Sequence, residues 1–409
     1  MPGRLLVLSN GHGEDLIALR VLQALHRRRP ELQIIVLPLV GSGSAFVPAE
    51  EAGVLKRVGP RRLLPSGGFS NQSIQGLLAD LGAGLLGLSW RQWRLVRRWG
   101  GSADAVLAVG DLLPLLFAWS SGASYGFIGT PKSDYTWRSA PGTAGFADCY
   151  HRCKGSEWDP WEWWFMRHRR CRLVAMRDRL TARALRRRGV AALAPGNPMM
   201  DCLDAQDLPG PLAARRRLLL LGGSRMPEAL GNVRRLLGCL DWVGFSEPVV
   251  VMAPCGSMPT PQQWEPLLTS LGYVPATLPA DTGAAAAWQK GTVLLLVGPG
   301  CFGRWAALAE VGLAAAGTAT EQLVGLGVPA LSLPGPGPQF QLGFARRQSR
   351  LLGGAVTVCR TQRQLAERLG LLLRDPDQRA SQGRIGRRRM GAAGGSEALA
   401  GLLEQRLLR

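Results

Sequence analysis

The segment spanning residues 313–342 constrains the fold more than any other part of this 409-residue chain. A short apolar run, Val311–Ala316, stops at Gly317, and a helix-like pattern follows over residues 321–327. A second apolar run, Val328–Leu333, then leads into a loop rich in glycine and proline. Strand, glycine turn, helix and strand in this order predict a βαβ unit, which places the segment in a parallel sheet covered by helices.

The glycine turn after the first strand is suited to a ligand, because small residues let a ligand approach the backbone. A helix that begins there also turns free N–H groups and the positive end of its dipole toward an anion. Glu321 would suit a ribose, since one carboxylate accepts hydrogen bonds from both hydroxyls of a diol. The alternative is an ordinary βαβ unit whose glycines only turn corners, and these residues leave both interpretations open.

Three motifs resemble those of one enzyme family. Residues 317–321 (GTATE) are similar to the SGTATLE signature of lipid-A-disaccharide synthase, and residues 221–225 (LGGSR) resemble its LPGSR motif. Residues 195–201 (PGNPMMD) resemble its VGHPLVD motif. The segment of residues 313–342 also looks like the donor-site segment of GT-B glycosyltransferases. The resemblance therefore implies an α/β fold in which two Rossmann-like domains face an inter-domain cleft.

The resemblance also implies how substrates divide between the domains. The carboxy-terminal domain would bind a UDP-sugar and the amino-terminal domain the acceptor, with no cofactor and no required metal. Arg225 and the helix N-termini would hold the diphosphate, Glu321 the ribose, and two glutamines the sugar or a phosphate. The donor-binding candidates are Gly223, Ser224, Arg225, Gly317, Thr318, Thr320, Glu321, Gln339 and Gln341.

The amino-terminal half offers candidates for proton transfer. The loop of residues 10–15 (NGHGED) follows the strand pattern Arg4–Ser9, where an α/β sheet places its first ligand loop. Asp111 ends a second strand pattern beside a glycine, which is a suitable position for a general base. Both positions also suit helix N-caps, and that alternative stays open. The catalytic candidates are Asp111, His12 and Glu14, and the acceptor-side candidates are Asn10, Gly11, Gly13 and Asn197.

The length of the chain predicts two domains, because one hydrophobic core rarely serves so many residues. Prolines and glycines are concentrated in the segment Ala192–Pro211, which reads as a linker. We therefore expect an amino-terminal acceptor domain of residues 1–200 and a carboxy-terminal donor domain of residues 201–409.

The chain has a formal net charge of +20, nearly all of it from arginine, and this favours anionic partners. No module typical of nucleic-acid-binding proteins is visible, so we expect no nucleic-acid partner. The eight scattered cysteines indicate reduced thiols in the cytoplasm. A zinc site is one interpretation of Cys149 and Cys153, which are followed by His168 and Cys171. The second pair lacks the usual two-cysteine knuckle, so we predict no bound metal.

The amino-terminal apolar run is too short to predict a secretory signal, and no run of about 18 apolar residues predicts a membrane span. The segment Trp158–Met166 (WDPWEWWFM) is followed by several arginines, a composition typical of a peripheral membrane anchor. A packed aromatic segment with a solvated basic flank is the alternative. We expect a cytoplasmic protein that could lie on the inner face of the membrane, contacting it through Trp158, Trp161, Trp163 and Trp164.

The function that these patterns favour, together with the resemblance, is transfer of a hexose from a UDP-sugar to a lipid or glycolipid acceptor, as in lipid A biosynthesis. Two alternatives remain open. A UDP-sugar epimerase would use the same fold without an acceptor, and a non-catalytic protein at the membrane would bind the sugar nucleotide without releasing UDP.

Overall fold

The structure is a computed structural model that describes residues 3–11, 13–60, 81–82, 84–99, 105–139, 141–142, 145–203, 207, 209–256, 258–335 and 340–408. It divides into two compact units. Unit 1 comprises Met1–Arg138, Ala144–Asp201 and Ala392–Arg409, and unit 2 comprises Ser139–Thr143 and Cys202–Gly391. The units change at Asp201, one residue from the predicted boundary, but they differ from the predicted domains because residues 392–409 belong to unit 1.

Unit 1 is built on a sheet of parallel strands, seven of them within the described residues, in the order β3-β2-β1-β4-β5-β6-β7. Aliphatic residues dominate the strands Arg4–Ser9, Gln33–Pro38 and Ala105–Gly110, as expected for strands buried on both faces. The strands are β1 (Arg4–Ser9), β2 (Gln33–Pro38), β3 (Lys56–Arg57), β4 (Ala105–Gly110), β5 (Ser124–Gly129), β6 (Cys171–Met176) and β7 (Ala192–Leu193).

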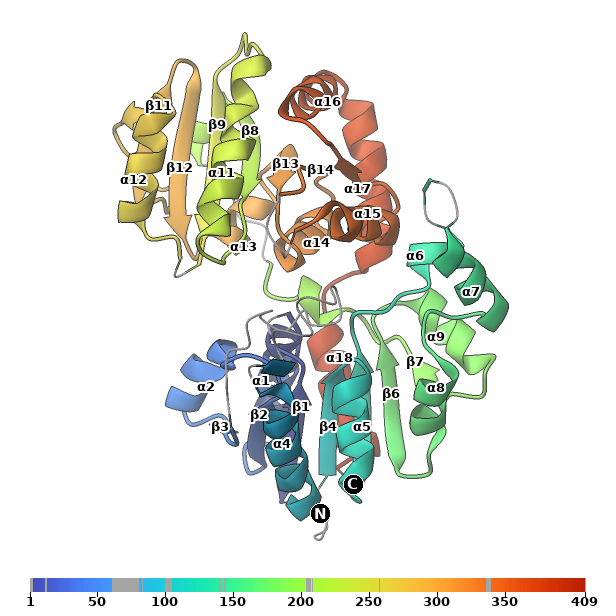
Figure 1. Ribbon diagram of the computed structural model, residues 1–409. Coiled ribbons are helices and arrows are strands. Elements are labelled where there is room, and N and C mark those ends of the chain that lie inside the picture. The colour runs from blue at the N-terminus through green and yellow to red at the C-terminus, as the bar shows by residue number, and fades with distance from the viewer. Residues whose placement is uncertain are drawn as a thin grey trace. The chain divides into compact units, whose positions relative to one another are not determined.

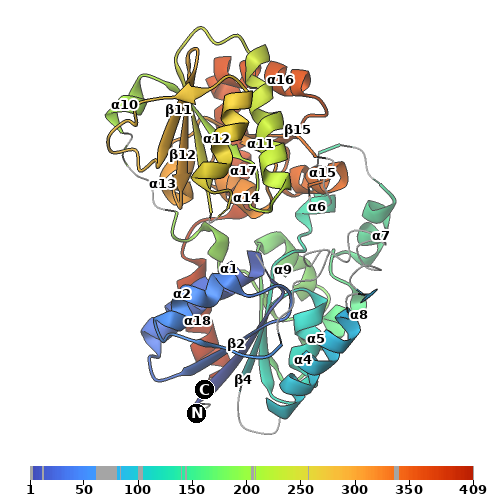
Figure 2. The ribbon, with the colours of Figure 1, turned by 60° about the vertical axis from the view of Figure 1, so that its left-hand side comes forward.

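Helices cover both faces of this sheet (Figures 1 and 2). One face packs against α4 (Leu85–Trp99), α5 (Leu112–Ser120), α8 (Pro160–Arg167) and α9 (Arg179–Arg186), which share one hydrophobic core with alternate strand residues. The other face packs against α1 (Gly13–Arg28) and α18 (Gly395–Arg406). Shorter helices complete the unit: η1 (Ser44–Phe46), α2 (Val47–Glu51), α6 (Tyr135–Arg138), α7 (Phe146–Lys154) and η2 (Pro198–Met200).

Helix α18 is held against unit 1 at its start and along its length. The carboxylate of Asp201 accepts hydrogen bonds from the backbone N–H groups of Gly394 and Ser396, at 2.5 and 2.7 Å. Two ion pairs then join α18 to α1, Arg27 with Glu397 at 2.5 Å and Arg28 with Glu404 at 2.8 Å. These contacts explain why residues 392–409 belong to unit 1, which the sequence pattern did not predict. The pattern indicated an amphipathic helix but could not name its partner.

Unit 2 contains a second sheet, in the order β10-β11-β12-β9-β8-β13-β14-β15, with eight strands in the described part of the chain. Strands β10 and β11 are antiparallel to their neighbours and the others are parallel. The strands are β8 (Arg216–Leu221), β9 (Val249–Cys255), β10 (Val274–Pro275), β11 (Ala286–Lys290), β12 (Val293–Pro299), β13 (Val311–Ala314), β14 (Ala330–Ser332) and β15 (Val356–Val358).

Helices also cover both faces of the second sheet. Its main core lies under α11 (Glu228–Gly238), α12 (Pro261–Ser270), α15 (Leu342–Leu351) and α16 (Gln362–Arg374). On the other face lie α13 (Phe302–Ala306) and α14 (Thr318–Gly325), where Trp305 packs on Gly298 and Leu323 on Gly312. Helix α17 (Pro376–Met390) packs on α14, and the remaining elements are α10 (Gly210–Ala213) and η3 (Leu240–Trp242).

The close approach of α17 to α14 depends on two glycines. A Cβ atom on Gly383 would lie 2.2 Å from the carbonyl oxygen of Gly327, and one on Gly386 would lie 2.3 Å from that of Val324. No side chain fits at such distances, so both positions require glycine. Helix α14, which carries the predicted ribose ligand, is therefore seated directly on the backbone of α17.

Both sheets have the doubly wound order of a Rossmann-like domain. In each unit the first strand lies at the centre, the next two parallel strands extend to one side, and the later ones extend to the other. In unit 2 the β10–β11 pair is added beyond the third parallel strand. The predicted fold class, α/β with two Rossmann-like domains, is confirmed.

Candidate active site

The first candidate site lies where the strand order of unit 1 reverses, between β1 and β4. Ligands of doubly wound sheets bind at such points, beyond the carboxyl ends of the strands. The loop after β1 carries Asn10 and Gly11, and the loop after β4 carries Asp111. The side chain of Asn10 hydrogen-bonds to Asp111, and a Cβ atom on Gly110 would lie 2.8 Å from that of Asn10. The two predicted loops therefore meet.

Gly11 and Gly13 shape the first loop. The φ angle of Gly11 is +92°, and a Cβ atom there would lie 2.8 Å from the carbonyl oxygen of Val40. Its own carbonyl accepts a hydrogen bond from the N–H of Glu14 at 3.1 Å, and Gly13 begins α1. Both glycines thus position Glu14 in the first turn of the helix. His12, the other predicted catalytic residue of this loop, lies outside the described residues.

Glu14 and Asp111 form a pair of interacting carboxyl groups. Burial, with a smaller contribution from the negative charge of Asp111, raises the pKa of Glu14 to about 7. Burial also raises the pKa of Asp111, against the hydrogen bond that its carboxylate accepts from the N–H of Leu113 at 3.2 Å. Asp111 is therefore also the N-cap of α5, as the alternative interpretation expected. A carboxyl group with a pKa near 7 exchanges protons readily at neutral pH.

Two further residues join this pair, and neither was among the predicted site residues. The hydroxyl of Thr130, after β5, donates to Glu14 Oε1 at 3.2 Å. The positive charge of Lys132 lowers the pKa of Asp111, and its Nζ also pairs with Glu162 at 2.6 Å. Their position in the loop after the strand next to β4 was the signal that could have identified them, because neighbouring strand ends share one edge of the sheet.

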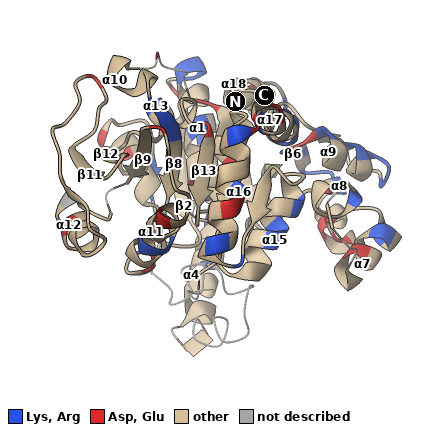
Figure 3. Ribbon diagram, turned by 90° about the horizontal axis from the view of Figure 1, so that it is seen from above, with Lys and Arg blue, Asp and Glu red and all other residues tan. Residues whose placement is uncertain are grey.

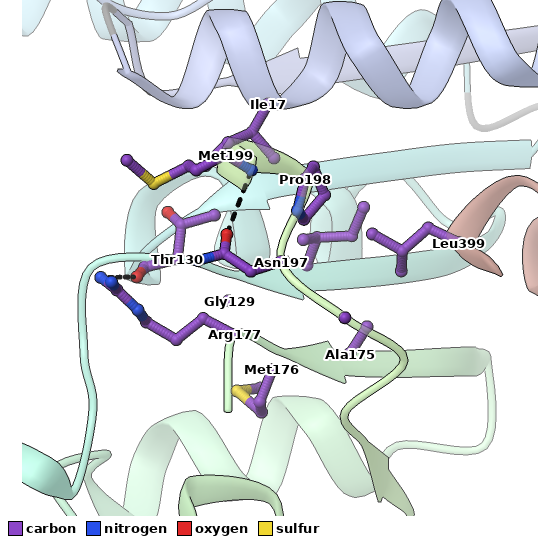
Figure 4. Close-up of a pocket in the computed structure, with 12 residues that line it drawn as sticks. Ile17, Gly129, Thr130, Ala175, Met176, Arg177, Asn197, Pro198, Met199 and Leu399 are labelled. Carbon is purple, nitrogen blue, oxygen red and sulfur yellow. Dashed lines mark hydrogen bonds between the residues drawn. The ribbon is translucent and has the colours of Figure 1, made fainter. Parts of the chain in front are cut away.

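Asn197 lies in a small pocket that shares Thr130 with the first candidate site and is shown in Figure 4. It is buried, and its side-chain oxygen accepts a hydrogen bond from the N–H of Met199 at 3.2 Å. Thr130 and Arg177 line the same pocket, and Arg177 donates to the carbonyl of Thr130 at 3.3 Å. A Cβ atom on Gly395 would lie 2.7 Å from the backbone of Asn197. Asn197 thus holds the turn against which α18 begins, and its acceptor-side role stays a prediction.

The second candidate site lies at the corresponding point of unit 2, between β8 and β13. These strands pair in parallel, with Leu221 opposite Ala314, so the loops that follow them are neighbours. Gly223, with φ of +91°, passes so close that a Cβ atom there would lie 3.4 Å from the carbonyl oxygen of Ala315. Gly223 and Ser224 are exposed, while Arg225 is partly buried. The structure therefore brings the LGGSR and GTATE segments together at one sheet edge.

Helix α14 begins at this edge. Gly317 is its N-cap and Thr318 its first residue, and Glu321 lies in the first turn. Gln348, on α15, donates to the carbonyl of Gly317 at 2.9 Å and so fixes the turn before the helix. An α-helix that starts beside an exposed glycine loop supplies the N–H groups and the positive dipole end that a diphosphate requires.

One donor-site candidate has a different environment from the one predicted. Thr320 is fully buried, and its hydroxyl donates to the carbonyl of Ala316 at 2.6 Å. This side chain braces the turn from inside instead of presenting its hydroxyl to a diphosphate. Gln341 is exposed at the N-cap of α15, and Gln339 lies outside the described residues.

The tryptophans predicted to contact a membrane divide into two pairs. Trp158 is completely buried and Trp163 is 7% exposed, so the prediction is wrong for these two, which pack in the core of unit 1. Trp161 and Trp164 are each 52% exposed on α8. Trp158 precedes α8, and on the helix Trp163 faces the core whereas Trp161 and Trp164, three residues apart, share the exposed side. No helix among the described residues is long and apolar enough to cross a membrane.

The residues considered as zinc ligands lie on separate elements of unit 1. Cys149 and Cys153 lie on α7 and Cys171 begins β6, and the described residues contain no group of three or more metal-ligating side chains. Lysine and arginine residues fall on helices of both units, among them α9 and α15 (Figure 3).

No protein-family model matches this sequence, and no curated protein matches it. Solved structures of low sequence identity nevertheless share its fold. A protein assigned as a UDP-N-acetylglucosamine 2-epimerase from Listeria monocytogenes aligns with a TM-score of 0.60 and 12% identity, over 99% of this chain and 96% of its own. MurG from Acinetobacter baumannii aligns with a TM-score of 0.54 and 15% identity, over 99% and 100% of the two chains. For the calicheamicin glycosyltransferase CalG4 the TM-score is 0.56 and the identity 14%, over 98% of each chain. With its two Rossmann-like units, the chain has the GT-B fold.

Proposed function

We propose that this protein is a glycosyltransferase that moves a hexose from a UDP-sugar to a hydroxyl group of a lipid or glycolipid acceptor. The observation that carries the proposal is the meeting of the LGGSR and GTATE segments at the switch point of unit 2, where α14 begins. Of the solved structures with the same fold, CalG4 is named as a glycosyltransferase and the Listeria protein as a UDP-N-acetylglucosamine 2-epimerase, which is consistent with an enzyme that acts on a sugar nucleotide.

Unit 2 would bind the donor. The exposed turn of Gly223 and Ser224 and the N-terminus of α14, with Gly317 and Thr318, would receive the diphosphate, and Arg225 would neutralise its charge. As the bond between the anomeric carbon and the diphosphate oxygen breaks, its electron pair leaves with UDP. A guanidinium and helix N–H groups stabilise that growing charge, and in this proposal they take the place of a divalent metal.

Unit 1 would bind the acceptor. Its hydroxyl oxygen forms the new bond to the anomeric carbon and must lose its proton during the attack. Glu14 is the base in this proposal, because its carboxylate has a pKa of about 7 and therefore accepts a proton at neutral pH. Asp111, whose charge raises that pKa, positions and tunes Glu14. Asn10 and Thr130 orient the two carboxylates through hydrogen bonds.

A lipid acceptor requires access to a membrane, and α8 offers two exposed tryptophans for a peripheral contact, Trp161 and Trp164. The motifs that resemble lipid-A-disaccharide synthase make a lipid A precursor the first acceptor to try. In this proposal the protein acts in the cytoplasm, at the inner face of the membrane.

Activity is tested with the purified protein and a panel of UDP-sugars, with and without lipid extract, by measuring UDP release. We expect release that depends on both the sugar nucleotide and the lipid, and that is unchanged by a chelator. Conversion of the UDP-sugar to an epimer without lipid would instead identify an epimerase. Binding of UDP-sugar without any release of UDP would leave a non-catalytic binding protein, and activity restored only by manganese would contradict the metal-independent mechanism.

The donor site is tested by calorimetry with UDP. Glu321→Ala should weaken binding by about 1.5–3 kcal/mol, because the ribose hydroxyls lose a charged hydrogen-bond acceptor. Arg225→Ala should weaken it by a similar amount through the diphosphate. Glu265→Ala and Arg384→Ala change the same residue types at exposed positions on α12 and α17 and serve as matched controls. Unchanged UDP binding by Glu321→Ala would show that the donor site is misassigned.

A further inference from the structure

A row of tryptophans crosses one helical face of unit 1. Helix α5 packs against both α4 and α8, which lie on either side of it in Figure 1. Trp90 and Trp93 of α4 stack with ring centroids 4.8 Å apart, and Trp119 of α5 meets Trp164 of α8 edge to face at 5.5 Å. Trp90 is 58% exposed. Indole rings concentrated on one face are characteristic of surfaces that lie at the headgroup level of a bilayer.

A groove of about 300 Å³ connects the two tryptophan pairs. Trp93 of α4 and Trp119 of α5 both line it. Arg97 and Arg170 also line it, and no acidic residue does so among the described residues. The groove therefore combines two aromatic walls with two guanidinium groups.

The two arginines are held in place without being neutralised. Arg97 donates to the carbonyl of Ser120 at 3.0 Å, and its guanidinium lies 5.7 Å from the ring centroid of Trp93. Arg170 donates to the carbonyls of Trp119 and Ala123 at 2.9 and 3.2 Å. All three acceptors are neutral backbone oxygens at or beyond the carboxyl end of α5, where cations are favoured by the helix dipole. Within the described part of the chain, neither guanidinium forms an ion pair.

We propose that this groove binds the headgroup phosphate of an anionic phospholipid, and that the tryptophan row across α4, α5 and α8 docks on the surface of an anionic bilayer. The charge of the groove selects the headgroup, and the exposed rings of Trp90 and Trp164 enter the interface. The proposal concerns a surface separate from the two candidate sites. It does not depend on glycosyl transfer, because vesicle binding is measured without substrate.

Co-sedimentation with vesicles tests the proposal. The full chain should bind vesicles containing phosphatidylglycerol much more tightly than vesicles of phosphatidylcholine alone. The double variant Arg97→Gln, Arg170→Gln should bind the anionic vesicles about thirtyfold more weakly, since each arginine near such a surface contributes about fivefold. Arg384→Gln with Arg388→Gln removes the same charge from an exposed face of α17 and should bind as the parent does.

A second variant separates lost binding from lost folding, because Arg170 also caps α5. Trp90→Ala changes a mostly exposed side chain, so the variant should keep the parent's thermal unfolding midpoint while losing vesicle affinity. Equal binding to neutral and anionic vesicles would overturn the proposal, as would equal losses in the α17 control. Binding of inorganic phosphate in the groove can be measured by quenching of tryptophan fluorescence. If the protein binds inorganic phosphate in this way but does not bind vesicles, the bilayer assignment is also overturned.

Discussion

Replacing Glu14 with glutamine should reduce the rate of glycosyl transfer by about 10²–10⁴-fold, the usual contribution of a general base. Glutamine keeps the size of the side chain and can still accept the hydrogen bond from Thr130, but it cannot take a proton. UDP binding should stay close to that of the parent, because the donor is assigned to unit 2. Steady-state UDP release and calorimetry with UDP measure the two quantities separately.

The dependence of the rate on pH distinguishes a base from a structural residue. Burial raises the pKa of Glu14 to about 7, and the basic form is the carboxylate. The parent's rate should therefore be high above pH 7 and should fall as the pH drops through that value. Removing the charge of Asp111 by Asp111→Asn should lower the pKa of Glu14 and shift this decline to lower pH, with much of the turnover lost.

Glu51→Gln is the matched control, because Glu51 is exposed on α2 of the same unit and should leave the rate unchanged. A Glu14→Gln enzyme that keeps the parent's rate and its acidic limb would show that another group takes the proton. If the Glu14→Gln enzyme keeps the parent's rate but no longer loses activity at acidic pH, Glu14 is the group that titrates, and another residue acts as the base.

Replacing Gly386 with valine should destabilise unit 2 by about 3 kcal/mol or more, at the upper end of what overpacking costs. The new Cβ atom would lie 2.3 Å from the carbonyl oxygen of Val324, which is backbone and cannot rotate away. Helix α14 must then move off α17, and the turn that precedes it must move too. We therefore expect a fall of roughly 6–12 °C in the unfolding midpoint of this unit, together with weaker UDP binding by the variant that remains folded.

Gly370→Ala provides the control on the neighbouring helix α16. A Cβ atom on Gly370 would meet only the far end of the flexible Arg374 side chain, at 3.8 Å. Removing a glycine from a helix should stabilise the protein by about 0.5–1 kcal/mol there. Calorimetric unfolding of both variants compares the two outcomes. If the Gly386→Val variant unfolds at the same temperature as the parent, the backbones of α14 and α17 are not in the close contact described.

The fold could be predicted because its strands are unusually uniform in composition. The strand pattern Arg4–Ser9 has its predicted bounds, and the apolar run Val311–Ala316 contains β13, which ends two residues earlier at Ala314. Nearly continuous aliphatic runs between glycine turns have few other solutions. The antiparallel pair β10 and β11 was not predicted. Val274–Pro275 is too short to show alternation, and Ala286–Lys290 mixes small, aromatic and polar residues.

The candidate sites were predicted at the level of loops more reliably than at the level of side chains. Asp111 and Glu14 were placed at strand ends, but their mutual electrostatic contact depends on the spatial order of β1 and β4, which no local pattern contains. Thr320 shows that a correctly placed loop can still contain a side chain whose orientation the sequence does not reveal. Its place in the GTATE segment suggested a ligand contact, whereas the rotation of α14 turns its hydroxyl back to Ala316. Sequence spacing identifies the edge of a sheet, and packing decides which side chains face it.

The position of α18 has a consequence for biosynthesis. During translation the strands of unit 1 leave the ribosome first, yet the helix that covers one face of their sheet is made only after all of unit 2. The apolar residues of α1 that meet Leu399 and Leu403 remain exposed during that interval, a condition that favours aggregation or chaperone binding. Unit 1 therefore completes its core last although it begins first, and a ribosome stalled within unit 2 would present an unfinished amino-terminal sheet.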